Sequence, residues 1–184
     1  MKKTIFVIAF AASVVCASGM LAKTGMVRFF SKTSIMDIEG VTQSAVSSLN
    51  LDSGKIAIKS RNTTYVFPDK LMQEHFNENY MESTKFPTSS FTGTFTGLNK
   101  EAFDAGKRVT IIVDGMLDVH GVSKRYHSPA YLQKGADGSV TGDTKFFVKM
   151  VDHSIKVPSV VASNLCDSME ITSKFTWLPV EVSK

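Results

Sequence analysis

Residues 67–95, FPDKLMQEHFNENYMESTKFPTSSFTGTF, decide the fold, because the sequence pattern changes there from helical to strand-like. Pro68 and Asp69 suit the start of a helix, since an aspartate side chain can accept hydrogen bonds from the first free amides. The residues that then share one face at helical spacing are Leu71, Met72, His75 and Phe76. This spacing predicts one short amphipathic helix over residues 69–80.

The second half of the stretch has the pattern of a half-buried strand. Pro87 cannot continue a helix, because it lacks the amide hydrogen that the helical bonding pattern needs. Phe91, Gly93 and Phe95 then alternate with threonines, as expected when one face of a strand is buried and the other is exposed. A short helix that packs over a sheet is the simplest architecture with this order.

Most of the remaining chain has alternating strand patterns separated by turn residues. The alternating segments are residues 27–31, 56–60, 90–96, 108–120, 126–132, 146–150 and 171–178. A further strand is expected to end at Tyr65 and Phe67. Asp52-Ser53-Gly54, Gly121 and Asp137-Gly138 supply turns between these segments, which predicts a meander of antiparallel strands.

Antiparallel strands at this spacing can close into a barrel or stack as a sandwich. A barrel needs long, bent strands, and glycines inside strands allow such bends. Gly93, Gly97 and Gly115 are suitably placed for them. The alternation alone leaves both architectures open.

Two blocks of sequence carry a resemblance to a known family. The first is HFNENY at residues 75–80 with Lys85, Phe86, Pro87 and Phe91; the second is GMLDVHGVSK at residues 115–124. Both blocks resemble motifs of the YceI-like proteins, which are lipocalin-like barrels associated with binding polyisoprenoid or related lipids. The resemblance favours a mainly β fold, an antiparallel lipocalin-like β-barrel whose one short helix packs at a barrel end.

The start of the chain has the three-part layout of a secretory signal peptide. Lys2 and Lys3 precede an apolar run over residues 5–15, and small residues follow as far as Ala22. The expected organisation is therefore a leader at residues 1–22 and a single YceI-like β-barrel domain at residues 23–184. The mature protein is expected to be periplasmic or otherwise exported.

A membrane or lipid anchor at this leader is less favoured. The apolar run is shorter than the roughly 20 residues that cross a bilayer. Cys16 follows Val15, whereas a lipidation site would have a small residue before the cysteine. Loss of the leader would leave Cys166 as the single cysteine, so no intrachain disulfide is expected. The scattered, nearly balanced charges have no basic patch of the kind that binds nucleic acid.

Large apolar side chains share the face that would point into the barrel. A packed core is one interpretation, because barrels of this size either fill their interior or hold one ligand. The family resemblance favours a cavity for a polyisoprenoid or isoprenoid-quinone-like molecule. The predicted ligand-binding residues are Phe76, Phe86, Phe91, Phe95, Ile111, Val113, Leu117, Phe146, Val148, Met150, Phe175 and Trp177.

The predicted helix is expected to plug one end of the barrel, with Phe76 and Phe86 at the mouth of the cavity. In this picture the tail of the ligand lies inside and its head group stays near the mouth. Asn77, Asn79 and Lys85 are polar residues that would meet that head group there.

The histidines have no spacing typical of a metal site, and no metal or other cofactor is predicted. His75 is expected to be a hydrogen-bonded structural residue. His120 and Asp118 lie two apart on one strand, so their side chains point the same way and a carboxylate–imidazole contact is sterically allowed. No motif for a nucleophile, a phosphate loop or paired carboxylates is present, and no enzyme activity is predicted.

The leading hypothesis is an exported lipid-binding protein that sequesters or carries a long hydrophobic molecule by apolar burial. The first alternative is a fully packed structural or interaction module without a ligand. The second is a lipid-directed enzyme that uses His120 and Asp118. A homodimer is consistent with the family resemblance, but no residue indicates its interface.

Overall fold

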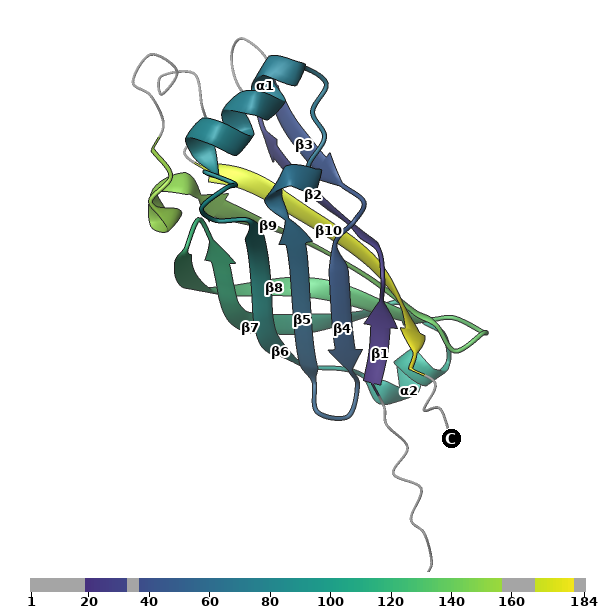
Figure 1. Cartoon of the computed structure of the whole chain (residues 1–184). Helices are drawn as coiled ribbons and strands as arrows, with labels where there is room; N and C mark the ends of the chain where they lie inside the picture. The colour runs from purple at the N-terminus through teal and green to yellow at the C-terminus, as the bar shows by residue number, and fades with distance from the viewer. Residues whose placement is uncertain (1–18, 33–36, 157–167, 181–184) are drawn as a thin grey trace, which may run out of the picture.

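The computed structural model describes residues 19–32, 37–156 and 168–180, which form one antiparallel barrel with a helix near each end (Figure 1). The strands are β1 (Gly19–Ala22), β2 (Gly25–Ser31), β3 (Ile38–Thr42), β4 (Val46–Asn50), β5 (Lys55–Arg61), β6 (Thr88–Thr96), β7 (Val109–Val119), β8 (Val122–Lys134), β9 (Val140–Lys149) and β10 (Ser168–Pro179). The helical elements are η1 (Asn62–Thr64), α1 (Lys70–His75), η2 (Phe76–Tyr80), α2 (Lys100–Asp104) and η3 (Met150–His153). The mainly β, lipocalin-like barrel predicted from the sequence is confirmed.

The barrel closes because its first two strands are each broken into two pieces. β1 pairs with β4 and with the end of β10, whereas β2 pairs with the earlier part of β10 and with β3. β1 and β2 therefore form one strand of the barrel, and β3 and β4 form the next. Together with β5 to β10, which pair in chain order, they make a closed antiparallel barrel of eight strands.

The longest hairpin joins β7 to β8 through the two-residue loop His120-Gly121. Both residues have positive φ, 53° and 71°, as a type I′ hairpin turn requires. A Cβ atom at Gly121 would approach the Phe86 ring to 2.5 Å, so this position needs glycine for its space as well as its backbone. The predicted turn at Gly121 is therefore confirmed and lies directly against Phe86.

Helix α1 begins and docks as the sequence predicts. The Asp69 side chain accepts a hydrogen bond of 2.9 Å from the Met72 amide. The helix continues as the π-helical turn η2 to Tyr80, so together they cover residues 70–80 of the predicted 69–80, and Asp69 is the N-cap. Phe76 packs among three aromatic rings of the barrel end, and its centroid lies 5.1 Å from that of Phe29 and 4.9 Å from that of Phe67.

The half of the barrel farther from α1 is filled with side chains. Phe95, Phe103, Leu132, Phe175 and Trp177 are all buried in one apolar cluster there. The indole Nε1 of Trp177 donates a 3.0 Å hydrogen bond to the Ser47 hydroxyl, so the one polar atom of this ring is satisfied. This cluster packs the end of the barrel, hereafter the lower half, and its upper members Leu132, Phe175 and Trp177 also line the cavity above it.

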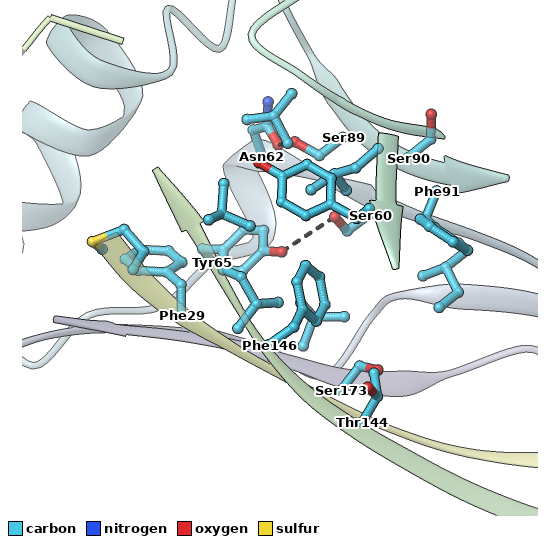
Figure 2. A pocket seen from close by; sticks show the side chains of 18 of the residues that line it. Phe29, Ser60, Asn62, Tyr65, Ser89, Ser90, Phe91, Thr144, Phe146 and Ser173 are labelled. Carbon is cyan, nitrogen blue, oxygen red and sulfur yellow. Dashed lines mark hydrogen bonds between the residues drawn. The ribbon is translucent and has the colours of Figure 1, made fainter. Parts of the chain in front are cut away.

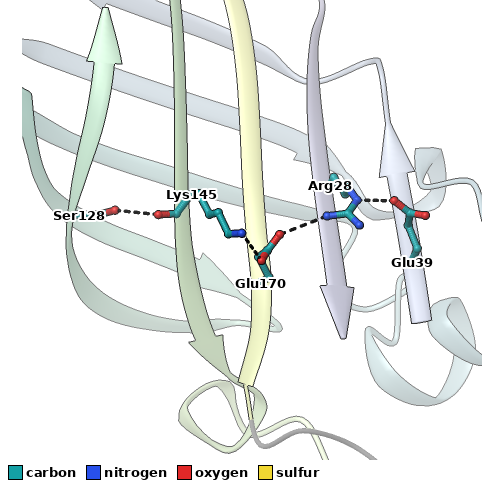
Figure 3. Close-up of polar contacts among 5 residues, drawn as sticks. All are labelled: Arg28, Glu39, Ser128, Lys145 and Glu170. Carbon is teal, nitrogen blue, oxygen red and sulfur yellow. Dashed lines mark hydrogen bonds and ion pairs between the residues drawn. The ribbon is translucent and has the colours of Figure 1, made fainter. Parts of the chain in front are cut away.

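Alternating charges hold the broken strands to the rest of the barrel on its outer face. Figure 3 shows Glu39 on β3, Arg28 on β2, Glu170 on β10 and Lys145 on β9 in one row. Arg28 donates to Glu39 and also to Glu170, the latter at 3.3 Å, and Lys145 pairs with the other oxygen of Glu170. Because these charges are partly exposed, each pair contributes modestly, but the row spans four neighbouring strands.

Two segments differ from the sequence prediction. Tyr65 and Phe67 do not end a strand, because Asn62 turns the chain into η1. The fully buried Asn62 amide donates to the Phe86 carbonyl at 2.6 Å and accepts from the Ser89 hydroxyl at 2.9 Å. The expected break at residues 97–107 contains the helix α2, which the Asn99 side chain caps by accepting a 3.0 Å hydrogen bond from the Ala102 amide.

The barrel also begins earlier than the predicted domain start at residue 23. β1 comprises residues 19–22, which the sequence pattern assigned to the leader, and Met20 and Ala22 are buried in its core. The small residues of this segment suit a cleavage region, but they also fit a short strand at the point where the barrel closes. Within the described residues, no helix is long and apolar enough to cross a membrane.

Candidate functional site

A cavity occupies the half of the barrel beneath α1. Its volume is about 520 Å³, within the range of about 300–1,000 Å³ that is typical of small-molecule sites. Its wall is mostly apolar, with residues from the β-strands, from the Tyr65–Phe67 segment and from α1 and η2. The cavity therefore lies between the packed lower half and the docked helix, and Figure 2 shows part of its lining.

Most of the predicted ligand-binding residues line this cavity. They are Phe76, Phe91, Ile111, Val113, Leu117, Phe146, Val148, Met150, Phe175 and Trp177. Alternation identifies the eight that lie on strands, because strands with one buried face place every second side chain inside. Phe76 lies on η2 and follows from helical spacing, and Met150 begins η3 directly after β9. That they contact a ligand stays a prediction.

Phe86 and Phe95 do not line the cavity. Phe86 packs against His120, with 4.5 Å between the ring centroids, and closes the space beside the β7–β8 turn. Phe95 is buried in the lower half, because β6 carries it two residues below Gly93 and into the packed cluster. The side chain of Phe95 points inward, as predicted. The alternating pattern does not indicate how far along the barrel axis an inward side chain lies, so it did not distinguish the cavity from the packed half.

Several lining residues were not among those predicted. Phe29, Tyr65 and Phe67 form an aromatic cluster with Phe76 under the helix. Tyr65 and Phe67 come from an irregular segment, so no periodic pattern indicates their direction. Hydroxyl-bearing residues also line the cavity, namely Ser60, Ser128, Thr144 and Ser173. Ser173 does carry a signal, because it alternates with Ile171, Phe175 and Trp177 on β10.

The phenol groups of the cavity are neutral. Burial raises the pKa of Tyr65 above its ordinary value, although the hydrogen bond with Ser60 acts in the opposite direction. The two hydroxyl oxygens are 3.2 Å apart, as drawn in Figure 2. Burial also raises the pKa of Tyr126, and the negative charge of Asp152 adds to this shift. Neither tyrosine supplies an anion near neutral pH.

Tyr126 is held in place by the fully buried His153. The Nδ1 atom of His153 lies 2.9 Å from the Val122 carbonyl oxygen, which can only accept, so Nδ1 carries the proton. Nε2 is then free to accept from the Tyr126 hydroxyl, 3.0 Å away. This histidine is therefore a structural residue that orients one aromatic wall of the cavity.

The contact that the spacing of His120 and Asp118 allows is not formed. The Nε2 atom of His120 lies 2.8 Å from the Glu82 carboxylate and Nδ1 lies 3.2 Å from the His153 carbonyl oxygen. The Asp118 carboxylate instead accepts from Ser123 at 2.8 Å. The positive φ of His120 in the turn directs its ring toward the segment after η2, away from the strand neighbour. Among the described residues, no cluster of side chains suits a metal ion.

Two of the three polar residues expected at the mouth, Asn77 and Lys85, have partners within the protein. Asn77 donates to the Gln73 carbonyl at 2.9 Å and accepts from the Ser83 hydroxyl at 2.8 Å. The Lys85 ammonium lies 4.8 Å from the centroid of the Phe86 ring. His75 lies at the rim, where it lines the cavity from α1. These contacts favour a structural role for Asn77 and Lys85 over recognition of a head group.

The contact between Glu82 and His120 fastens the end of the helix to the β7–β8 turn. Replacing Glu82 by alanine removes this hydrogen bond, so we expect a hydrophobic fluorescent probe to leave the cavity about three- to tenfold faster. This range corresponds to a contact worth about 1 kcal/mol at a partly exposed site. Stopped-flow measurement of probe release checks it.

Glu78→Ala is the matched control, because Glu78 lies on η2 and is exposed. It should leave the release rate unchanged. An equal rate for Glu82→Ala and the unmodified protein would show that this contact does not restrain the helix.

A comparison with protein-family models matches residues 13–177 to the YceI-like domain. The match spans most of the 184 residues of the chain and includes all of the described strands except the end of β10. Comparison with curated protein sequences gives no match.

Solved structures with the same fold include the following three. A polyisoprenoid binding domain from Saccharophagus degradans, implicated in plant cell wall breakdown, superposes with a TM-score of 0.73 at 12% identity over 89% of this chain and 99% of its own. BcnA from Burkholderia cenocepacia superposes with a TM-score of 0.69 at 14% identity, over 83% and 95% of the two chains. The YCEI protein of Campylobacter jejuni gives a TM-score of 0.58 at 16% identity, over 76% and 81%. Identities this low show the fold alone.

Proposed function

The chain belongs to the YceI-like domain family, and from that premise we propose that it binds a hydrophobic molecule of the polyisoprenoid or isoprenoid-quinone type inside its barrel. The proposed role is to sequester or carry this molecule by burial, without covalent chemistry. The Saccharophagus degradans neighbour is itself described as a polyisoprenoid binding domain, which supports the class of ligand.

The observation that carries this proposal is the apolar cavity under α1. Each methylene group moved from water into such a space contributes up to about 0.8 kcal/mol, so an apolar chain can bind with few polar contacts. A fully packed barrel, the first alternative, does not describe this half, where about 520 Å³ is enclosed by aromatic and aliphatic side chains. The aromatic cluster around Phe76 holds the helix over the cavity, which supports this role.

The alternative of a lipid-directed enzyme depends on His120 and Asp118 acting together. His120 contacts Glu82 and a backbone carbonyl, and Asp118 contacts Ser123, so neither side chain acts on the other. Both also lie at the β7–β8 turn, beside the cavity wall. The proposal therefore assigns binding to the cavity and a structural role to these residues.

We further propose that the protein is exported and that its leader ends before β1. The strand begins at Gly19 and contributes buried residues, so cleavage after Ala22 would remove it from the barrel. Ala17 is a small residue that suits the position before a cleavage site. Dimer formation and the lack of nucleic-acid binding remain predictions from the sequence.

Mass spectrometry of an organic extract from freshly purified protein tests the proposed function. An unrelated exported protein, treated in the same way, controls for lipid carried through purification. A single isoprenoid compound near one equivalent per chain is the expected result. An extract that matches the control, together with no binding of added isoprenoids, would refute the proposal.

A further inference from the structure

The floor of the cavity carries a patch of hydroxyl groups in otherwise apolar surroundings. Ser128 on β8, Thr144 on β9 and Ser173 on β10 all line the cavity. Thr144 and Ser173 are direct partners in the β9–β10 register. Ser173 is followed on the inner face of β10 by Phe175, which belongs to the packed lower half. The three hydroxyls, hereafter the floor hydroxyls, therefore lie in the lower wall of the cavity, just above Phe175 and Trp177, and Figure 2 shows Thr144 and Ser173 together below Phe146.

Two of the floor hydroxyls already use their protons within the barrel wall. Thr144 donates to the Pro129 carbonyl oxygen at 2.8 Å. Ser128 lies within hydrogen-bond distance of the Pro129 and Lys145 carbonyl oxygens, at 3.1 and 3.5 Å, and Figure 3 shows the second of these contacts. A hydroxyl has one proton and two acceptor lone pairs, so both groups can still accept a hydrogen bond.

Ser173 differs from its two neighbours. Its side chain is only 6% exposed, and its hydroxyl has no hydrogen-bond partner among the residues that the structure describes. The Ser173 oxygen is not among the side-chain atoms that are sealed from solvent, so it is accessible from the cavity, and a ligand oxygen can accept its hydrogen bond without displacing a protein partner. Ser173 thus offers a donor to an oxygen atom at the floor, while Ser128 and Thr144 offer acceptors.

The groups around the floor hydroxyls restrict the charge of such a ligand. No lysine or arginine is among the described residues that line the cavity. Of the lining carboxylates, Asp69 caps α1 at the mouth and Asp143 pairs with Arg108 at 2.9 Å. An anionic group such as a phosphate would find no counter-charge at the floor, so burying it there would be costly. A neutral hydroxyl or carbonyl meets no such penalty.

We propose that the ligand enters with a neutral oxygen-bearing end, a hydroxyl or carbonyl, which the floor hydroxyls bind while its hydrocarbon part extends toward α1. This rests on the proposed function and specifies its ligand. A volume of about 520 Å³ corresponds to about 17 groups of water size, at about 30 Å³ each. The enclosed part of the ligand therefore matches an isoprenoid alcohol of about fifteen carbons.

The test compares an isoprenoid alcohol of this size with the hydrocarbon of the same skeleton, in the full mature protein and in Ser173→Ala. Fluorescence of Trp177, the one tryptophan of the chain, reports binding because it lines the same cavity. Ser173→Ala should lower the affinity for the alcohol about three- to tenfold. The affinity for the hydrocarbon should stay unchanged or rise. Ser90→Ala, which removes a lining hydroxyl at the upper end of β6, should leave the ratio of the two affinities as it is.

The outcomes separate this inference from the proposed function. If both compounds bind and Ser173→Ala does not change the ratio of their affinities, the floor hydroxyls do not bind the ligand's oxygen and the inference is overturned. The same holds if Ser90→Ala changes the ratio equally. If neither compound binds to the unmodified protein, the proposed function fails and the inference fails with it.

Discussion

Replacing Val113 by aspartate is expected to reduce retention of an isoprenoid ligand at least about 30-fold. Val113 lines the cavity from β7, and its neighbour across the β7–β8 register is Ser128. A carboxylate at this position either stays ionised beside an apolar ligand or takes up a proton, and both cost free energy on binding. About 2 kcal/mol, the lower end of the cost of an unpaired polar group in apolar surroundings, corresponds to this factor. Mass spectrometry of the organic extract, normalised to protein, checks the result.

Met116→Asp on the same strand is the matched control. Met116 is 45% exposed and points outward, so its replacement should change neither the amount of bound lipid nor the melting temperature. Circular dichroism must show that Val113→Asp is folded. A folded Val113→Asp variant that retains lipid normally would place the ligand somewhere else. Phe95→Asp is unsuitable for this test, because Phe95 lies in the packed lower half and its replacement would destabilise the fold.

Removing β1 is expected to destabilise the barrel by at least about 3 kcal/mol. Deleting a buried methionine side chain alone costs about 2–5 kcal/mol, and Met20 is buried in the core. The deletion also leaves β4 and the end of β10 without the strand that pairs with both. Unpaired strand edges of this kind promote aggregation. Urea unfolding of two chains, one that begins at Ser18 and one that begins at Lys23, measures the difference.

A third chain tests whether the loss comes from the strand or merely from a shorter chain. Ending the longer form at Val180 removes only four residues and keeps every described strand, so it should unfold at the same urea concentration as the chain that ends at Lys184. Equal stability of the chains that begin at Ser18 and Lys23 would show that β1 is dispensable. Cleavage after Ala22 would then be compatible with a folded barrel, and the mass of the exported protein would show whether it occurs.

The sequence was most informative where one backbone pattern persisted over many residues. The long alternation from residue 108 to 120 predicted β7 and its inner face, and the Asp69 cap predicted the start of α1. β1, β3 and β4 were missed because they are short and lie beside breaks in the barrel's first two strands. Such breaks depend on partners far along the chain, above all on β10.

The sequence predicted most of the residues that line the cavity but not how far the cavity extends along the barrel. Alternation shows which side chains point inward, yet it does not show how deep along the barrel the packing ends. Phe175 and Phe95 have the same inward pattern, but Phe175 lines the cavity and Phe95 does not. The partners of His120 were also unpredictable, because Glu82 is 38 residues away in the chain and reaches it only after the helix has docked.

The filled lower half restricts the path by which a molecule could enter or leave the cavity. Trp177, Phe175 and their neighbours bound the cavity partway down the barrel, so in the described structure a ligand of the proposed kind would enter and leave at the end near α1. A molecule therefore cannot be threaded from one face of the protein to the other. Under the proposed carrier role, a donor and an acceptor would dock at the same end of the barrel one after the other, as expected of a shuttle.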